Sequence, residues 1–332
     1  MSTLEQLRKY TTIVADTADS HVLDAFQPQD GTTNPSHILQ AAKLSKYVQV
    51  LKDAATYGTQ QQTDMDKRLE SALLMVLVQF GAEILKHVPG RVSTEVDAIH
   101  TFDTQGTVSM AREIVALYAS FGIDRSRVLI KIASTWEGLM ACEVLEKEGI
   151  HCNMTLVFSL VQAKLAAEVG ATLISPFVGR TMDWYQKHVP GKDYTGHKDP
   201  GVVLVKTIYD YYKSSGIKTE VMAASLRNMD ECIHLAGCDL MTIAAPLLEE
   251  LRTADYAVSK KQLSHPVSNG TQVSKTLSSN YLTHESDFRL DLFADQAATD
   301  KINESLRIFL RDGAELKHML EAIMNDLAAS PE

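Results

Sequence analysis

The stretch Leu129-Ile130-Lys131-Ile132-Ala133, followed directly by Ser134-Thr135-Trp136-Glu137-Gly138, decides how the rest of the chain is interpreted. It places a lysine inside an apolar run typical of a buried strand, where an ammonium group must lose its water or find anionic partners. One explanation is chemical, because a desolvated amine that loses its proton attacks a carbonyl and forms a Schiff base. The other is structural, because a lysine near a strand end extends its alkyl stem toward solvent. The run alone leaves both explanations open.

The composition is that of a large globular protein. Its 332 residues are 45% hydrophobic, which is enough to bury a sizeable core. Lysine and arginine number 32 against 42 aspartates and glutamates, and the net charge of -10 argues against broad binding to nucleic acid or to anionic membranes. We find no signal segment and no apolar window as long as a membrane span, so we expect a cytoplasmic protein.

The cysteines agree with a reducing compartment. They lack CxxC spacing and are too sparse for a disulfide framework. They are Cys142, Cys152, Cys232 and Cys238.

Short β-rich runs alternate with longer helical patterns along the chain. The runs span residues 12–16, 31–34, 92–95, 128–133, 151–156, 172–176, 220–224 and 240–243. One amphipathic helix is marked by Leu69, Leu73, Val76, Leu77, Phe80 and Ile84, and another by Val108, Ala111, Val115 and Tyr118. Eight strand-then-helix units predict an α/β protein with a parallel (β/α)8 TIM barrel, in which the short polar second strand is required mainly by the count.

Further segments lie outside these eight units. Ser2 and Glu5 have capping-box spacing and predict a short N-terminal helix, and Ser134 with Glu137 have the same spacing after the lysine strand. Pro35 follows Asn34, where a helix is expected to begin. We interpret residues 1–332 as one barrel domain, with 298–328 as a C-terminal helical extension that packs on the outside of the barrel and is interrupted at Gly313. This extension is also compatible with a homodimer contact.

Two other segments exceed what a barrel needs. Residues 181–199 form an excursion that can fold over the barrel mouth, and residues 253–297 show no steady period.

Polar residues fall where the predicted strands end. The carboxyl ends of barrel strands converge on one face, so these side chains meet there although they are far apart in the sequence. The set contains Asp16, Asn34, Glu95, Lys131, Asn153, Thr155, Ser175, Ser225, Arg227 and Thr242. Each residue alone is an ordinary turn or cap residue. A lysine, two carboxylates, two amides and several hydroxyls at one mouth indicate a catalytic site.

The sequence resembles the transaldolase family over almost its whole length. The resemblance is carried by 14–17 (VADT), 28–36 (PQDGTTNPS), 90–97 (GRVSTEVD), 130–138 (IKIASTWEG), 149–156 (GIHCNMTL), 173–180 (LISPFVGR) and 224–228 (ASLRN). The chain departs from the family pattern at Ala18, Gly31, His37, Ala223 and Leu226. None of these departures removes a reactive group, but Ala223 and Leu226 flank Ser225.

The resemblance implies a role for each site residue. Transaldolases move a dihydroxyacetone unit from a ketose phosphate to an aldose phosphate through an imine on a lysine, and Lys131 matches that lysine. Asp16 matches the residue that handles the C4 hydroxyl proton, and Glu95 with Thr155 matches the proton shuttle for imine formation. The expected ligands of the three-carbon unit are Asn34, Asn153 and Ser175, and those of the phosphate are Arg180, Ser225 and Arg227. Phe177 is expected to keep the space near the enamine apolar, or else only to fill volume.

Other chemistries are weighed against this interpretation. The chain has no GxGxxG or P-loop motif and no HExxH spacing, so we expect neither a cofactor nor a metal. Trp184, Tyr185 and Tyr194 near two lysines form a lid or a packed loop rather than a nucleic-acid site. The expected partners are sugar phosphates: sedoheptulose 7-phosphate or fructose 6-phosphate as donor, and glyceraldehyde 3-phosphate or erythrose 4-phosphate as acceptor, in the pentose phosphate pathway. A fructose-6-phosphate-type aldolase that releases free dihydroxyacetone is one alternative, and a non-catalytic barrel scaffold is the other.

Overall fold

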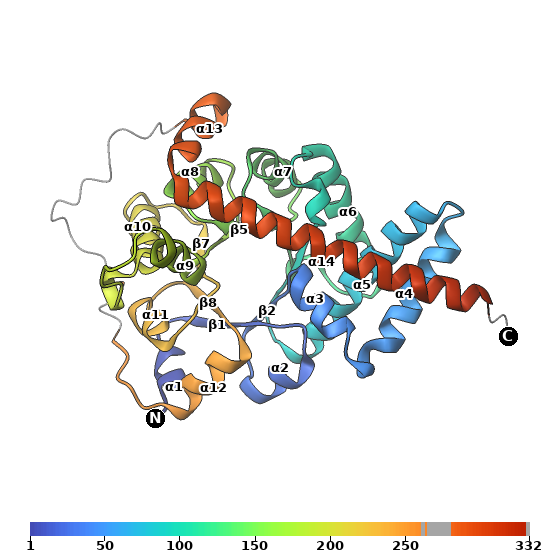
Figure 1. Cartoon of the computed structure of the whole chain (residues 1–332), viewed down its shortest axis with the longest axis horizontal. Coiled ribbons are helices and arrows are strands. Elements are labelled where there is room, and N and C mark those ends of the chain that lie inside the picture. The colour runs from blue at the N-terminus through green and yellow to red at the C-terminus, as the bar shows by residue number, and fades with distance from the viewer. Residues whose placement is uncertain (260–262, 264–279, 330–332) are drawn as a thin grey trace.

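Eight parallel strands close into a barrel in the computed structural model, which describes residues 1–259, 263 and 280–329 (Figure 1). The strands are β1 (Thr12–Asp16), β2 (Asp30–Thr32), β3 (Val92–Glu95), β4 (Val128–Ala133), β5 (Cys152–Val157), β6 (Leu173–Pro176), β7 (Glu220–Ala223) and β8 (Leu240–Ile243). Each strand pairs with its neighbours in chain order, and β1 also pairs with β8. The predicted (β/α)8 barrel with additional terminal helices is confirmed.

The predicted strand positions hold to within a residue or two. The expected bounds of β1, β3, β4 and β8 are those observed. The short polar strand β2 exists, and its Thr32 pairs with Asp16 on one side and with Ser93 on the other. A three-residue strand is therefore sufficient to bring Asn34, two positions further on, to the same end of the barrel as Asp16.

Side chains alternate between the two faces of each strand, and those that point into the barrel form an apolar floor below a polar mouth. Leu129 belongs to a buried cluster with Val14, Leu173, Met222 and Leu240. Ile130 and Ile132, which point to the other face of β4, belong to the larger core between the strands and the helices. Lys131 lies two residues beyond Leu129 on the inward face, directly above the apolar floor.

Helices surround the barrel and extend from it. The α-helices are α1 (Thr3–Leu7), α2 (Ser20–Phe26), α3 (Pro35–Ala42), α4 (Val48–Gln61), α5 (Met65–His87), α6 (Thr104–Ser120), α7 (Trp136–Lys147), α8 (Leu160–Glu168), α9 (Val178–His188), α10 (Pro200–Ser214), α11 (Met229–His234), α12 (Ala245–Thr253), α13 (Glu285–Ala294) and α14 (Gln296–Ala329). Short 3-10 helices are η1 (Ser45–Tyr47), η2 (Ala98–His100), η3 (Arg125–Arg127), η4 (Gly196–Lys198) and η6 (Tyr281–Thr283).

Helix caps confirm two predictions and correct one. Ser2 and Glu5 form a capping box at α1, and the Asn34 side chain caps α3 with Pro35 in its first turn. The expected capping box from Ser134 to Glu137 is wrong. Thr135 caps α7 instead, accepting from the Gly138 N–H at 3.1 Å, so the helix begins one residue later.

Helix α14 lies across the carboxyl end of the barrel (Figure 1). Its residues Ile302, Leu306 and Phe309 pack with Leu156 and Phe177, which lie at or just beyond the ends of β5 and β6. The helix continues through Gly313, where we expected an interruption, and besides this contact with the mouth it packs against the outer helices α3, α4 and α5. The C-terminal segment therefore helps to build the site.

The two unusual segments also have structure. The first part of the excursion 181–199 belongs to α9, whose Trp184 Nε1 donates to Asp300 of α14 at 2.9 Å, and η4 lies near its end. The segment 253–297, which shows no steady period in the sequence, contains η6 and α13. Residues 260–262 and 264–279 of that segment lie outside the described residues.

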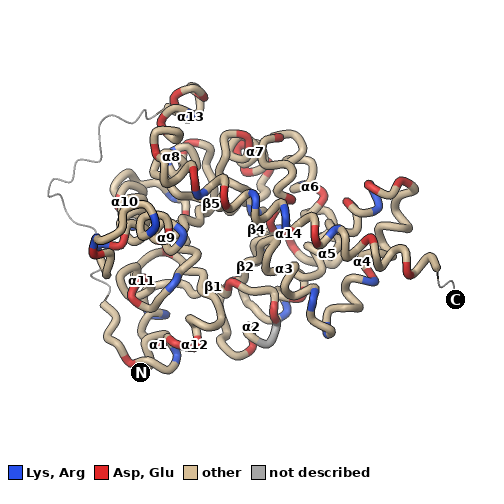
Figure 2. The backbone as a smooth tube through the Cα atoms, viewed as in Figure 1, with Lys and Arg blue, Asp and Glu red and all other residues tan. Residues whose placement is uncertain are grey.

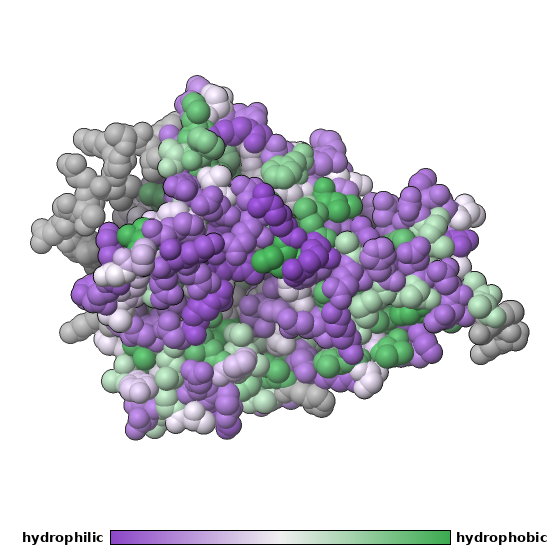
Figure 3. All heavy atoms as spheres, viewed as in Figure 1, coloured by the Kyte–Doolittle hydropathy of each residue, from purple (hydrophilic) through white to green (hydrophobic). Residues whose placement is uncertain are grey.

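The visible surface is polar and mixed in charge. Acidic and basic residues are interspersed along the elements (Figure 2), and the face in view is largely hydrophilic with separate hydrophobic clusters (Figure 3). Among the described residues, no helix has both the length and the apolarity needed to cross a membrane.

Candidate active site

A cavity of about 170 Å³ lies at the carboxyl end of the barrel, inside the ring of strand ends. It is lined by the predicted site residues other than Glu95 and Asn153, namely Asp16, Asn34, Lys131, Thr155, Ser175, Phe177, Arg180, Ser225 and Arg227. Glu95 contacts the lining residue Lys131, and Asn153 contacts the lining residue Ser175. The strand order thus brings the whole predicted set together, as parallel strands in a barrel require.

Lys131 is buried at the base of this cavity, with 4% of its surface exposed. Its Nζ donates to the Thr33 carbonyl at 2.9 Å and forms an ion pair with Glu95 Oε2 at 3.1 Å. The head of the side chain therefore does not extend to solvent, and the structural explanation of a strand-end lysine does not apply. A carboxylate supplies the anionic partner that burial of an ammonium group demands.

Glu95 is a candidate proton carrier. Burial raises its pKa above the ordinary value, and this effect outweighs the opposing charges of Lys131 and Arg180. Nearby, the Thr155 hydroxyl is fully buried and has no hydrogen-bond partner within the described ranges. A buried, unpaired hydroxyl that lines a cavity is available to a bound water or substrate.

Asp16 stays ionised for a different reason. Burial alone would raise its pKa, but the charges of His37, Lys131 and Arg180 and a hydrogen bond from His37 hold that pKa below the ordinary value. The His37 Nδ1 atom lies 3.2 Å from Asp16 Oδ1. The pKa values of the two carboxyl groups are thus shifted in opposite directions, that of Glu95 upward and that of Asp16 downward, a separation typical of acid and base roles.

A polar chain joins the third, fifth and sixth strands. Ser175 Oγ donates to Asn153 Oδ1 at 2.6 Å, and Asn153 Nδ2 donates to Ser93 Oγ at 3.0 Å. All three side chains are buried. Because the Asn153 amide is anchored on both sides, Ser175 presents its hydroxyl to the cavity in a fixed position.

Arg180 approaches the cavity from α9 and is held by α14. Its Nη1 donates to Ser305 Oγ at 2.7 Å, and its guanidinium lies over the rings of Phe177 at 5.2 Å and Phe309 at 5.8 Å. Burial and the charge of Arg227 lower its pKa from the ordinary value, although an arginine stays charged. The result is a preorganised cation at the wall of the cavity.

The loop after β7 completes the basic end of the cavity. Ser225 has a φ of 58°, a left-handed conformation that is strained for a serine, and the Arg227 guanidinium donates to Ser225 Oγ at 3.2 Å and to Asp183 Oδ2 at 2.9 Å. A side chain at Gly179 would meet Arg227 Cγ at 2.3 Å. Glycine at this position therefore lets α9 approach the loop and brings Arg180 near Arg227.

A buried carboxyl pair supports this loop from below. Glu231 accepts from the Arg227 N–H at 2.7 Å, and its side chain also hydrogen-bonds that of Asp199. Burial raises the pKa of Glu231 to about 7. The Glu231 carboxyl group is therefore expected to gain or lose its proton near neutral pH.

Three residues around the cavity have functional contacts that the sequence reasoning missed. His37 is a recognised departure from the family pattern, but nothing in the pattern indicates its contact with Asp16. Ser305 and Phe309 lie on α14, and the helical stripe predicts which face of that helix is apolar, not what it covers. Another departure has a local cause, because an alanine at Gly31 would place its Cβ 2.5 Å from Ile84 Cγ2.

One cluster of metal-ligand type exists among the described residues, away from the cavity. Ligand atoms of Cys142, Glu146 and Cys152 lie within 4.8 Å of one another. The Glu146 carboxylate already accepts from the Cys152 and Thr172 N–H groups at 2.9 and 2.7 Å. Burial, with the neighbouring Cys142, raises the pKa of Cys152 well above the ordinary value. A buried thiol with a raised pKa and a carboxylate already engaged in hydrogen bonds describe a structural cluster.

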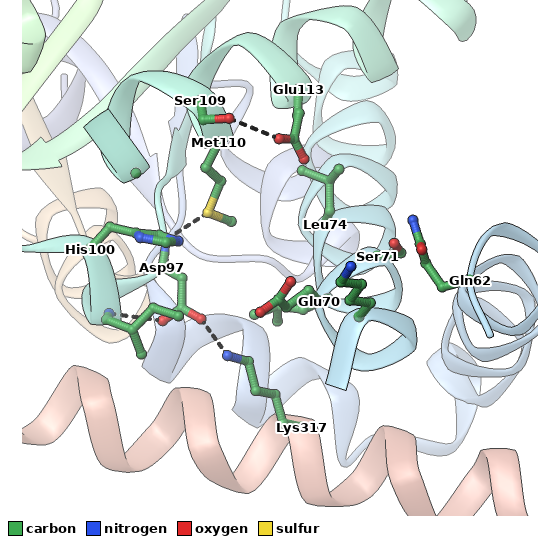
Figure 4. Close-up of a pocket in the computed structure, with 14 residues that line it drawn as sticks. Gln62, Glu70, Ser71, Leu74, Asp97, His100, Ser109, Met110, Glu113 and Lys317 are labelled. Carbon is green, nitrogen blue, oxygen red and sulfur yellow. Dashed lines mark hydrogen bonds and ion pairs between the residues drawn. The ribbon is translucent and has the colours of Figure 1, made fainter. Parts of the chain in front are cut away.

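A second hollow of about 400 Å³ lies outside the barrel mouth, between α5, α6, η2 and α14 (Figure 4). Asp97 of the β3–η2 connection pairs there with Lys317 of α14 at 2.8 Å, and Ser109 donates to Glu113 at 3.2 Å. The Asp97–Lys317 pair ties α14 to the barrel.

The fold and the cavity define a class of protein: a (β/α)8 barrel with a buried lysine, two carboxyl groups and a basic rim at the carboxyl ends of its strands. Residues 13–320 match the family model described as transaldolase/fructose-6-phosphate aldolase. A protein of Shewanella oneidensis named transaldolase is 48% identical over 321 residues, which cover 97% of this chain and 98% of that protein. A transaldolase of Shewanella baltica shows the same identity and coverage, and one of a further Shewanella strain is 46% identical over 325 residues, covering 98% and 99% of the two chains. The chain belongs to the transaldolase/fructose-6-phosphate aldolase family.

Proposed function

We propose that this protein is a transaldolase: a transferase that moves a dihydroxyacetone unit from a ketose phosphate to an aldose phosphate. The observation that carries the proposal is the buried Lys131 amine, 3.1 Å from Glu95 in a cavity that also presents the Asp16 carboxylate. The near full-length similarity to proteins named transaldolase supports the same reaction. Donors are sedoheptulose 7-phosphate or fructose 6-phosphate, and acceptors are glyceraldehyde 3-phosphate or erythrose 4-phosphate.

Imine formation is the first step. The Lys131 ammonium passes a proton to Glu95, and the free amine adds to the C2 carbonyl of the ketose to give a carbinolamine. Loss of the carbinolamine hydroxyl needs a proton, which returns from Glu95 with the Thr155 hydroxyl and a bridging water as the shuttle. Water leaves and the protonated imine forms. The raised pKa of Glu95 suits a group that must hold this proton for part of the cycle.

Carbon–carbon bond cleavage is the second step. Asp16 takes the proton of the C4 hydroxyl, the C3–C4 bond breaks, and its electron pair passes into the iminium to give a neutral enamine on Lys131. The aldose phosphate leaves. In the reverse direction the enamine carbon attacks the aldehyde of the acceptor, and Asp16 returns its proton to the new hydroxyl oxygen. Protons balance over the two half-reactions, so no cofactor and no metal are required.

Binding residues keep the intermediate in place between these half-reactions. We assign the hydroxyls of the three-carbon unit to Asn34, Asn153 and Ser175, and the phosphate to Arg180, Ser225 and Arg227. Arginine suits a phosphate because its planar fork donates parallel hydrogen bonds. Arg227 forms an exposed ion pair with Asp183 in the free protein. When the phosphate binds, Arg227 leaves Asp183 and shares the phosphate with Arg180.

Transfer rather than release follows from the surroundings of the enamine. Phe177 packs edge-on against Phe158 at 5.4 Å and carries no hydroxyl, so this wall of the cavity supplies no proton to the enamine carbon. We assign the protein to the cytoplasm and to the pentose phosphate pathway, and we treat residues 1–332 as one domain whose extension 298–328 completes the site. A homodimer is the expected assembly.

The test compares transfer with release. With fructose 6-phosphate and erythrose 4-phosphate, sedoheptulose 7-phosphate is expected to form much faster than free dihydroxyacetone appears when the acceptor is omitted. Release of dihydroxyacetone at a comparable rate favours the aldolase alternative. Failure of both reactions in correctly folded protein favours the scaffold alternative.

A further inference from the structure

One imidazole nitrogen lies between two groups of the site. The His37 Nδ1 atom is 3.2 Å from Asp16 Oδ1 and 3.3 Å from Asn34 Nδ2. His37 is in the first turn of α3, and its side chain is about one-quarter exposed at the edge of the cavity. It is therefore in contact both with the proposed base and with a proposed substrate ligand.

The backbone decides which atom of the Asn34 amide faces the ring. The His37 N–H, which can only donate, is 2.9 Å from the amide oxygen of Asn34 as the cap of α3. The other amide atom, toward the imidazole, is therefore the nitrogen, which is a donor only. An ionised Asp16 is an acceptor only. Nδ1 consequently serves one neighbour at a time: with a proton it donates to Asp16, and without one it accepts from Asn34.

The surrounding charges favour the first arrangement. The other charged groups that act on Asp16 are Lys131 from β4, Arg180 from α9 and Glu95 from β3, and Arg227 after β7 lines the same cavity. On α3 itself, Ser36 donates to Asp312 of α14, which fixes the start of the helix. Lys131 and Arg180 add to the lowering of the Asp16 pKa, and an anionic carboxylate accepts from an Nδ1–H, whereas the Asn34 amide nitrogen cannot.

We propose that His37 is a positioning residue for the transfer reaction: its Nδ1–H holds the Asp16 carboxylate, and so frees the Asn34 amide to donate to a substrate hydroxyl. The inference rests on the proposed function. With Oδ1 engaged by the ring, Oδ2 is the oxygen left to accept the C4 hydroxyl proton. When His37 has no proton on Nδ1, the base loses its partner and one of the two amide N–H donors of Asn34 is occupied by the ring, so one nitrogen controls two elements of the site.

The test uses two substitutions that differ in one feature. His37→Leu removes the donor, whereas His37→Asn keeps an N–H near the position of Nδ1. Two quantities are measured from pH 5 to 9: borohydride trapping of the fructose 6-phosphate adduct, and release of glyceraldehyde 3-phosphate in a single turnover. For His37→Leu we expect the yield of trapped adduct to stay within about twofold of wild type. The rate of glyceraldehyde 3-phosphate release should be about tenfold lower at neutral pH, and the acid limb of its pH–rate profile should move to higher pH.

The asparagine variant separates positioning from simple packing. We expect it to retain release within about threefold of wild type at neutral pH, because the hydrogen bond to Asp16 remains. A matched control is His87→Leu, since His87 pairs with Asp24 at 2.6 Å far from the cavity; its acid limb is expected to be that of wild type. Nitrogen-15 spectra of histidine-labelled protein should show a protonated Nδ1 for the resonance that is lost in His37→Asn.

The results are distinguishable. If wild type forms no trapped adduct, the proposed function is wrong, whatever the variants do. If wild type traps and releases normally but the leucine variant has an unchanged acid limb, or both variants lose release equally, the role of His37 is refuted. An Nδ1 without a proton at neutral pH would refute it as well.

Discussion

Glu95 and Lys131 are paired residues in the register of β3 and β4, and their side chains form an ion pair of 3.1 Å inside the barrel. Adjacent parallel strands set this relationship, because partner residues on one face point the same way. Both side chains are about 5% exposed. A proton can therefore pass between the acid and the amine without crossing solvent.

The first prediction separates the two acids. Asp16→Ala should still form a trapped ketose adduct but should not cleave it, because only the C4 proton transfer is lost. Glu95→Gln should slow adduct formation itself by about 100-fold, since an amide cannot take the lysine proton. Adduct mass against time after borohydride quenching measures both. Equal defects in the two variants would contradict the division of roles.

The second prediction concerns the support of Arg180 by α14. Ser305→Ala removes the hydroxyl 2.7 Å from Nη1, so the KM for fructose 6-phosphate should rise about fivefold with little change in kcat. With unphosphorylated fructose as donor, the variant should equal wild type. Asn303→Ala, an exposed position on the same helix, is the control. An equal loss with both donors would mean that Ser305 acts on the whole site and not on the phosphate end.

The sequence could predict the barrel and nearly all of its mouth for a physical reason. Apolar runs such as 128–133 mark strands, and strand ends such as Asp16 and Glu95 converge by topology alone. Contacts between elements distant in sequence could not be predicted in this way. The stripe on α14 indicates an apolar face but not that Phe309 would cover Arg180, and the proximity of His37 to Asp16 depends on the angle at which α3 leaves β2.

The third prediction is a pH dependence of stability. Burial raises the native pKa of Glu231 to about 7, so the native state binds this proton more tightly than the unfolded state. Its stabilising contribution is complete below the unfolded pKa of about 4.3 and is lost as pH rises through about 7. The free energy of unfolding of wild type should therefore fall as the pH rises from 5 to 8. In Glu231→Gln, which cannot titrate at this position, the fall should be smaller by about 2 kcal/mol.

Urea unfolding at a series of pH values measures this difference. The glutamine side chain in Glu231→Gln retains an acceptor for the Arg227 N–H and a donor for Asp199, so the fold should persist. Glu70→Gln, at an exposed position of α5, is the matched control and should follow wild type. Parallel curves for wild type and Glu231→Gln would show that the buried carboxyl does not titrate in this range.

The most direct test of the central claim is borohydride reduction with fructose 6-phosphate, followed by mass mapping of the modified peptide. The described chain contains two other buried lysines, Lys164 and Lys301. The position of the adduct therefore shows which buried lysine reacts with the substrate. We predict one adduct, on Lys131, which is absent in Lys131→Arg because a guanidinium does not add to the carbonyl, and which is retained in Lys301→Arg. An adduct on another lysine, or trapping that persists in Lys131→Arg, would contradict the account.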